Sequence, residues 1–238
     1  MIILHNMLGF FKTILYTPLF NVLILLASVV PGHDLGLAII LLTVIIRIIF
    51  FPLSIKAQRS QRAMNALAPK LAEIKAKFKN DQAAQGAATM QLYKDHGVNP
   101  VAGCIPLLIQ LPVLIALYQV FIAGLNPESL GGLYPFIPDP GNIKTLFLGS
   151  IDVTGKNHYL ALLAGVLQFV QAKQSIQYIQ SAGPANPQMK AMNAQMLYFL
   201  PVFIVIIGWN LSAGLVLYWV TTTVCSMFEQ WYLRKTMK

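Results

Sequence analysis

The most constraining feature of the sequence is the apolar run GLAIILLTVIIRIIFFPL at 36–53, in which Arg47 is the single charged side chain. A helix needs roughly 20 predominantly apolar residues to cross the hydrocarbon core of a bilayer. Further runs of this kind follow at 101–123, 158–179, 196–209 and 213–231. Only 11% of the 238 residues are charged, which is too few to cover a water-facing surface. The sequence therefore predicts an all-α integral membrane protein.

We expect a bundle of five membrane-spanning helices. Their expected bounds are 36–54, 101–123, 158–179, 196–209 and 213–231. The expected connections are a cytoplasmic helical hairpin at 55–97, an outer loop at 124–157 and a cytoplasmic loop at 180–195. Residues 1–35 would form a separate N-terminal segment, and residues 36–238 the core.

The uneven distribution of basic residues sets the expected orientation. Eight of them lie in the first connection: Lys56, Arg59, Arg62, Lys70, Lys75, Lys77, Lys79 and Lys94. Lys and Arg in short loops mark the cytoplasmic side, so alternation places the N-terminus outside and the C-terminus inside. The same patch suits a contact with anionic lipid or ribosomal RNA. A topology signal alone explains it equally well.

Residues 13–30 allow two interpretations. The run ILYTPLFNVLILLASVV is nearly long enough to cross the membrane, which would give six helices and a cytoplasmic N-terminus. Pro18 and Asn21 interrupt it, however, and an amphipathic helix lying in the outer membrane surface is also compatible with the pattern. We expect the interfacial helix.

The first connection has a helical pattern of its own. Four apolar residues at steps of four, three and four share one helix face: Leu67, Leu71, Ile74 and Phe78. Residues 80–81 and Gly86 offer places for a turn, so a second helix is expected at 87–95, ending near Gly97.

Arg47 is the first candidate functional residue. A charge inside a membrane span costs about 2.5–3.5 kcal/mol even on lenient scales, so the side chain should face protein or a water-filled cavity. Snorkelling toward the cytoplasmic boundary is the alternative, because that boundary lies only about two turns away. Among the spans, Glu229 near the inner boundary is the one acidic residue that could pair with it.

Other polar side chains in the spans could line the same cavity. Thr43 lies one turn before Arg47 and shares its face. The others are Gln110, Gln168, Gln171, Ser175, Tyr218, Thr222, Cys225 and Ser226. Each alone would be explained by a hydrogen bond between helices. Together they predict a hydrated groove in which an unpaired Arg47 attracts a negatively charged guest.

Three stretches occur in an order that covers nearly the whole chain: TVIIRIIFFPLSIKAQRS, YKDHGVNPVAGCIPLLIQLPVLIALY and SAGLVLYWVTTTV. In the first, a single Arg precedes a Pro at the helix end, and the second combines NP, GC and LLIQ. These stretches resemble the YidC/Oxa/Alb family of membrane protein insertases. The resemblance implies five core helices, a cytoplasmic hairpin that receives substrates and an outer-leaflet amphipathic helix. It also implies that Arg47 lines a hydrophilic groove open to the cytoplasm and lipid but closed outside.

Two sets of candidate site residues follow. The expected groove set is Arg47, Thr43, Gln110, Gln168, Gln171, Tyr218, Trp219 and Thr222. The expected substrate-receiving hairpin set is Arg59, Arg62, Lys70, Lys75, Lys77 and Lys79.

The resemblance also implies partners and a location. The expected partners are nascent membrane proteins and the lipid bilayer, and the resemblance leaves open whether the Sec translocon and the ribosome take part. The segment after Trp231 is short, so any ribosome contact is expected on the hairpin and on residues 180–195. We see no lipoprotein signal, transit peptide or large extracytoplasmic domain, so we expect a bacterial plasma membrane protein.

The other function classes have weaker sequence support. We expect no enzyme activity, cofactor, metal site or DNA binding, because the sequence has no P-loop, no HExxH motif and no paired acidic residues within the spans. A small-solute transporter is the alternative function, since transporters also use polar residues inside the membrane. That class typically shows repeat halves and paired broken helices, which we do not find in the sequence.

Overall fold

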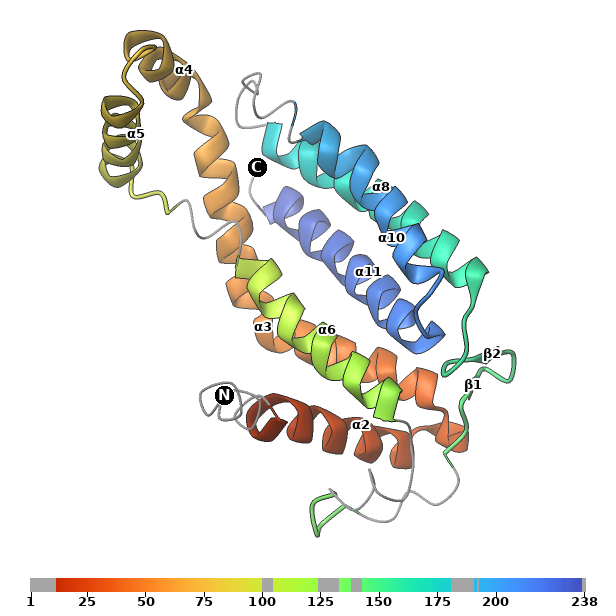
Figure 1. Cartoon of the computed structure of the whole chain (residues 1–238). Coiled ribbons are helices and arrows are strands. Elements are labelled where there is room, and N and C mark those ends of the chain that lie inside the picture. Colours follow the sequence, from red (N-terminus) through yellow and green to blue (C-terminus); the bar gives the residue numbers. More distant parts are fainter. Residues whose placement is uncertain are drawn as a thin grey trace, which may run out of the picture.

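The computed structural model describes residues 12–99, 105–123, 133–137, 143–180, 191 and 193–236. Parts of the expected second span (101–104), outer loop (124–132 and 138–142) and cytoplasmic loop (181–190) lie outside the described residues. Within the described residues the fold is helical apart from one small pair of strands (Figure 1).

The N-terminal helix α2 (Thr17–Val29) follows a π-helical turn and packs against α3 and α6. Pro18 lies in its first turn, where the missing N–H costs no helical hydrogen bond. Asn21 is buried, with its amide donating to Thr17 O (2.8 Å) and accepting from Tyr134 N–H (2.6 Å). The two residues that interrupt the apolar run are thus accommodated in one helix, which lies across the ends of α3 and α6 (Figure 1).

Helix α3 (Leu35–Ala66) is capped at its N-terminus by Asp34, whose two carboxylate oxygens both accept hydrogen bonds. One Asp34 carboxylate oxygen accepts from the backbone N–H groups of Gly36 (2.8 Å) and Leu37 (3.1 Å). The other accepts from Leu148 N–H (2.8 Å), which ties the helix start to the connection between α6 and α8. The helix contains Pro52 and continues through residue 54, where we expected the span to give way to the hairpin.

The hairpin therefore starts as the continuation of α3 and is completed by α4 (Ala68–Lys77) and α5 (Gln82–Asp95). Helix α5 begins at Gln82 rather than at the expected residue 87, because the Asp81 side chain caps it by accepting from Ala84 N–H (2.9 Å). Gly86, an expected turn position, lies inside α5. Both helices project beyond the rest of the bundle (Figure 1).

The remaining described helices are α6 (Ile105–Ala123), α8 (His158–Gln180), α10 (Leu200–Gly208) and α11 (Ala213–Thr236), with a π-helical segment (Gln195–Phe199) before α10. Helix α11 contacts both α3 and α8, and α10 packs on α8 (Figure 1). The connection at 124–157 contains the antiparallel strands β1 (Leu146–Phe147) and β2 (Ile151–Asp152).

The described helices differ in their length and in how many apolar side chains they expose. Of the described helices, α3 alone is both long and apolar enough to cross a membrane by length and composition. Only 22% of its most apolar window is buried inside the protein, so most of those side chains face outward. Shorter apolar helices occur at Thr13–Val29, Gln110–Val120 and Gln195–Gly208. Large apolar side chains such as Val166, Val202 and Ile206 are also exposed on α8 and α10.

Candidate functional site

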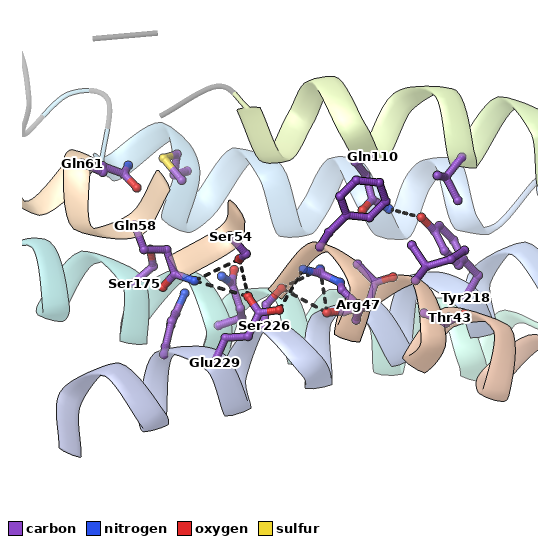
Figure 2. Close-up of a pocket in the computed structure, with 17 residues that line it drawn as sticks. Thr43, Arg47, Ser54, Gln58, Gln61, Gln110, Ser175, Tyr218, Ser226 and Glu229 are labelled. Atoms are coloured by element: carbon purple, nitrogen blue, oxygen red, sulfur yellow. Dashed lines mark hydrogen bonds and ion pairs between the residues drawn. The ribbon is translucent and has the colours of Figure 1, made fainter. Parts of the chain in front are cut away.

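A polar cavity of about 240 Å³ lies between α3, α6, α8 and α11 and is partly open (Figure 2). Its described lining residues are Thr43, Ile46, Arg47, Phe50, Ser54, Gln58, Gln61, Gln110, Val113, Gln171, Ser175, Met196, Tyr218, Thr222, Ser226, Glu229 and Gln230. We refer to this cavity as the groove. Most of its polar groups are amides and hydroxyls, and Arg47 and Glu229 are the two charged residues among those lining it.

Helix periodicity explains how the groove is assembled. The polar residues of α3 follow each other at steps of four, seven, four and three, which places them on one helix face: Thr43, Arg47, Ser54, Gln58 and Gln61. On α11 the steps are four, four and three: Tyr218, Thr222, Ser226 and Glu229. Gln171 and Ser175 lie one turn apart on α8. Three polar stripes therefore converge on one cavity.

Arg47 is held by oxygen atoms of α11. Its Nη2 donates to Thr222 O (2.9 Å) and to Ser226 Oγ (2.7 Å). Its Nη1 lies 3.5 Å from Glu229 Oε1. The side chain keeps 20% of its surface exposed. We expected an unpaired cation, and this expectation is wrong, because Glu229 lies within ion-pair distance of Arg47. Glu229 lies one helical turn after Ser226, which also binds Arg47.

Glu229 is the more deeply buried partner, with only 5% of its side chain exposed. It accepts hydrogen bonds from Ser54 Oγ (2.5 Å) and Gln58 Nε2 (3.3 Å), both on the part of α3 beyond Arg47. Buried charges persist where they are both paired and hydrogen-bonded, and Glu229 meets both conditions. The two formal charges in the groove lining cancel.

The two ends of the groove differ in their polar groups. Near one end, Gln110 Nε2 donates to Tyr218 Oη (2.8 Å), which connects α6 to α11 (Figure 2). Near the other, Gln230 is 3% exposed, and its side-chain oxygen has no hydrogen-bond partner within the described part of the chain.

Six of the eight expected groove residues line the cavity, and two lie beside it. Gln168 donates to Gln171 Oε1 (3.1 Å) and is 3.5 Å from Thr223 Oγ1, so it joins α8 to α11. Trp219 packs against the apolar core. Ser54, Gln58, Gln61 and Gln230 also line the groove and were not among the expected residues. Gln58 and Gln61 were missed because we ended the span at residue 54, although with Ser54 they continue the stripe that begins at Thr43.

The expected hairpin residues are spread over two helices and a turn. Arg59 and Arg62 lie on the extension of α3, Lys70, Lys75 and Lys77 on α4, and Lys79 in the turn that follows. The Arg62 guanidinium lies 5.0 Å from the centre of the Tyr178 ring on α8. Lys70 Nζ is 2.9 Å from His96 Nε2, which fixes α4 against the end of α5. Arg59, Lys77 and Lys79 are exposed.

A second, apolar cavity of about 290 Å³ lies along α3 and α11. It is lined by Val44, Arg47, Ile48, Phe51, Cys225, Phe228, Glu229, Trp231 and Tyr232. Arg47 and Glu229 line both cavities, so the ion pair separates a polar space from an apolar one. Within the described residues, no cluster of His, Cys, Asp or Glu has the composition of a metal site.

Comparisons with known proteins give the family. Residues 25–238 match the family model described as 60Kd inner membrane protein. A protein of Fusobacterium nucleatum named membrane protein insertase YidC is 33% identical over 202 residues, covering 85% of this chain and 87% of that protein. Proteins of the same name from Geotalea daltonii and Magnetococcus marinus are each 36% identical, and the matches cover 86% and 93% of this chain. The chain spans only about a third of their length, 34% and 35%. The chain therefore belongs to the 60Kd inner membrane protein family, whose members include the YidC membrane protein insertases.

Proposed function

We propose that this chain is a membrane protein insertase of the bacterial inner membrane, and that it integrates short or nascent membrane proteins through the groove. The observation that carries the proposal is a partly open polar cavity, with an arginine in its wall, inside a helical bundle whose outer surface is largely apolar. Family membership supports the same function.

The proposed membrane arrangement has five spans, near the expected bounds, with the N-terminus outside and the C-terminus inside. Helix α3 then runs inward from Asp34, and α4 and α5 lie in the cytoplasm. Helix α2 lies in the outer membrane surface, which its crosswise position relative to α3 and α6 supports. The excess of Lys and Arg at the end of α3, on α4 and at the end of α11 supports this orientation.

The proposed mechanism lowers the cost of moving a polar segment across the membrane. Groove amides and hydroxyls replace part of the water around the outer segment of a guest, which would otherwise lose its hydrogen bonds in hydrocarbon. Arg47 attracts carboxylates of that segment. A membrane potential adds about 2.3 kcal/mol per charge per 100 mV. The apolar helix of the guest moves into lipid, where apolar burial supplies the driving force.

We further propose that the hairpin receives guests before they reach the groove. Its exposed basic residues suit anionic lipid headgroups or ribosomal RNA. Any contact with the ribosome would use this surface and residues 180–195. Solute transport is the weaker alternative, because α3, α8 and α11 run unbroken past the groove, whereas transporter sites are typically formed by discontinuous helices.

Reconstitution tests the function. The purified chain is placed in liposomes, and protease-protected insertion of a single-span guest with an acidic outer tail is compared with empty liposomes. We expect insertion well above the empty-liposome level, and a loss of about tenfold in Arg47→Gln for acidic tails, the effect of removing one charge-assisted hydrogen bond. Insertion equal to empty liposomes by a folded protein would contradict the proposal.

A further inference from the structure

The two charges of the groove are arranged in a fixed order along the bundle. Arg47 is bound by Thr222 and Ser226 of α11, whereas Glu229 is bound by Ser54 and Gln58 of α3. Ser54 lies seven residues after Arg47, about 10 Å along the helix axis. Because α3 and α11 both run toward the hairpin side, Glu229 lies on that side of Arg47 (Figure 2). Under the proposed orientation, the groove is negative inward and positive outward.

We propose that Glu229 is a second specificity-determining residue, and that the groove selects guests by the order of their charges. The complementary guest has an acidic residue on the outer side, facing Arg47, and a basic residue on the cytoplasmic side, facing Glu229. This inference rests on the insertase function proposed above. Attraction of acidic tails by Arg47 alone would not need Glu229, whereas selection by charge order does.

The contacts of Glu229 support a role beyond neutralising Arg47. Its nearest partners are the neutral donors Ser54 and Gln58, and its distance to Arg47, 3.5 Å, is longer than a strong charge-assisted hydrogen bond. Ser54 and Gln58 can therefore hold the carboxylate in place when Arg47 turns to a guest. A guest with an acidic residue alone would leave two carboxylates beside one guanidinium. A guest that also carries a basic residue restores neutrality, and so reduces the cost of keeping these charges away from water.

Three matched guests test the proposal. They share one apolar span and differ at two positions of the outer tail: Glu outward and Lys inward, Lys outward and Glu inward, or Gln at both. The positions are two residues apart, about 7 Å in an extended chain, so that both charges reach the groove together. Liposomes are of zwitterionic lipid with no membrane potential, because a potential or an anionic surface would itself order the charges.

We expect the wild-type chain to insert the Glu-outward guest about tenfold better than the reversed guest, a difference of about 1.4 kcal/mol. In Glu229→Gln this ratio should fall to about one. The control Glu73→Gln removes an exposed carboxylate of α4 and should keep the tenfold ratio. Thermal unfolding of each variant shows whether it is folded, and Glu229→Asp should retain the preference.

The outcomes separate the two proposals. Equal insertion of all three guests by the wild-type chain, or an unchanged ratio in Glu229→Gln, would overturn the role of Glu229 and leave the insertase function standing. An equal loss for every guest in Glu229→Gln would make Glu229 a structural residue and also overturn the inference. Failure of the wild-type chain to insert any guest would overturn both.

Discussion

Helices α8 and α10 pack closely at Gly165, and adding a methyl group there is a sharp test of the packing. An alanine Cβ at this position would lie 2.3 Å from Val205 Cγ2 and 3.2 Å from Pro201 O. The first distance is shorter than real Cβ atoms show, the second is tighter than most Cβ contacts, and the oxygen belongs to a helix backbone that cannot turn aside. Because real Cβ atoms essentially never approach another atom within 3.0 Å, the cost should lie in the upper part of the range for overpacking, roughly 2–3 kcal/mol. Alanine is favoured over glycine in a helix by about 1 kcal/mol, so we expect a net loss of roughly 1–2 kcal/mol.

Thermal unfolding in detergent measures this loss. For a chain of this size each kcal/mol shifts Tm by about 2–4 °C, so Gly165→Ala should lower Tm by roughly 4 °C. Gly165→Ala with Val205→Ala should recover much of the difference, since the nearest clashing atom is removed. The matched control is Gly86→Ala in α5, where a Cβ meets nothing within 4 Å and Tm should not fall. An unchanged Tm in Gly165→Ala, or no recovery in the double variant, would refute the packing described.

Two further predictions concern the start of α3 and the wall of the groove. Asp34→Ala leaves three backbone N–H groups without their acceptor, so it should lower the free energy of unfolding by about 2–4 kcal/mol. Thermal unfolding measures this loss, and an unchanged Tm would contradict the capping role of Asp34. Gln171→Ala should reduce insertion of guests with polar outer tails in liposomes, whereas Gln168→Ala, which alters a residue beside the groove, should leave it near the wild-type level. Equal effects of the two substitutions would contradict the assignment of the groove wall.

Some of the site could be predicted because its signals are local. The cost of a charge among apolar residues identified Arg47, and the four-residue step identified Thr43 on the same face. These inferences need only helix geometry and the chemistry of the bilayer. The polar stripe of α11 was accessible for the same reason, since Tyr218, Thr222 and Ser226 follow one another at single-turn spacing.

The parts that were wrong or missed depend on which helices meet. Arg47 and Glu229 are 182 positions apart in the sequence, so their pairing depends on how α3 and α11 pack together. No local sequence pattern predicts that packing. Gln58 was missed because we ended the span at residue 54, whereas α3 continues as one helix to Ala66. The start of α5 was misplaced because Gly86 was weighed as a turn residue and the cap at Asp81 was not considered.

The central claim is that guests pass along the groove between α3, α6, α8 and α11. Photo-cross-linking from α8 tests it directly, because two positions on the same helix face different surroundings. Ser175 lines the groove, whereas Val166 is 61% exposed and is not among its lining residues. With a photoreactive side chain at each position and an arrested guest in liposomes, the account predicts strong cross-linking from position 175 and little from position 166. Equal cross-linking from both positions, or stronger cross-linking from position 166, would contradict it.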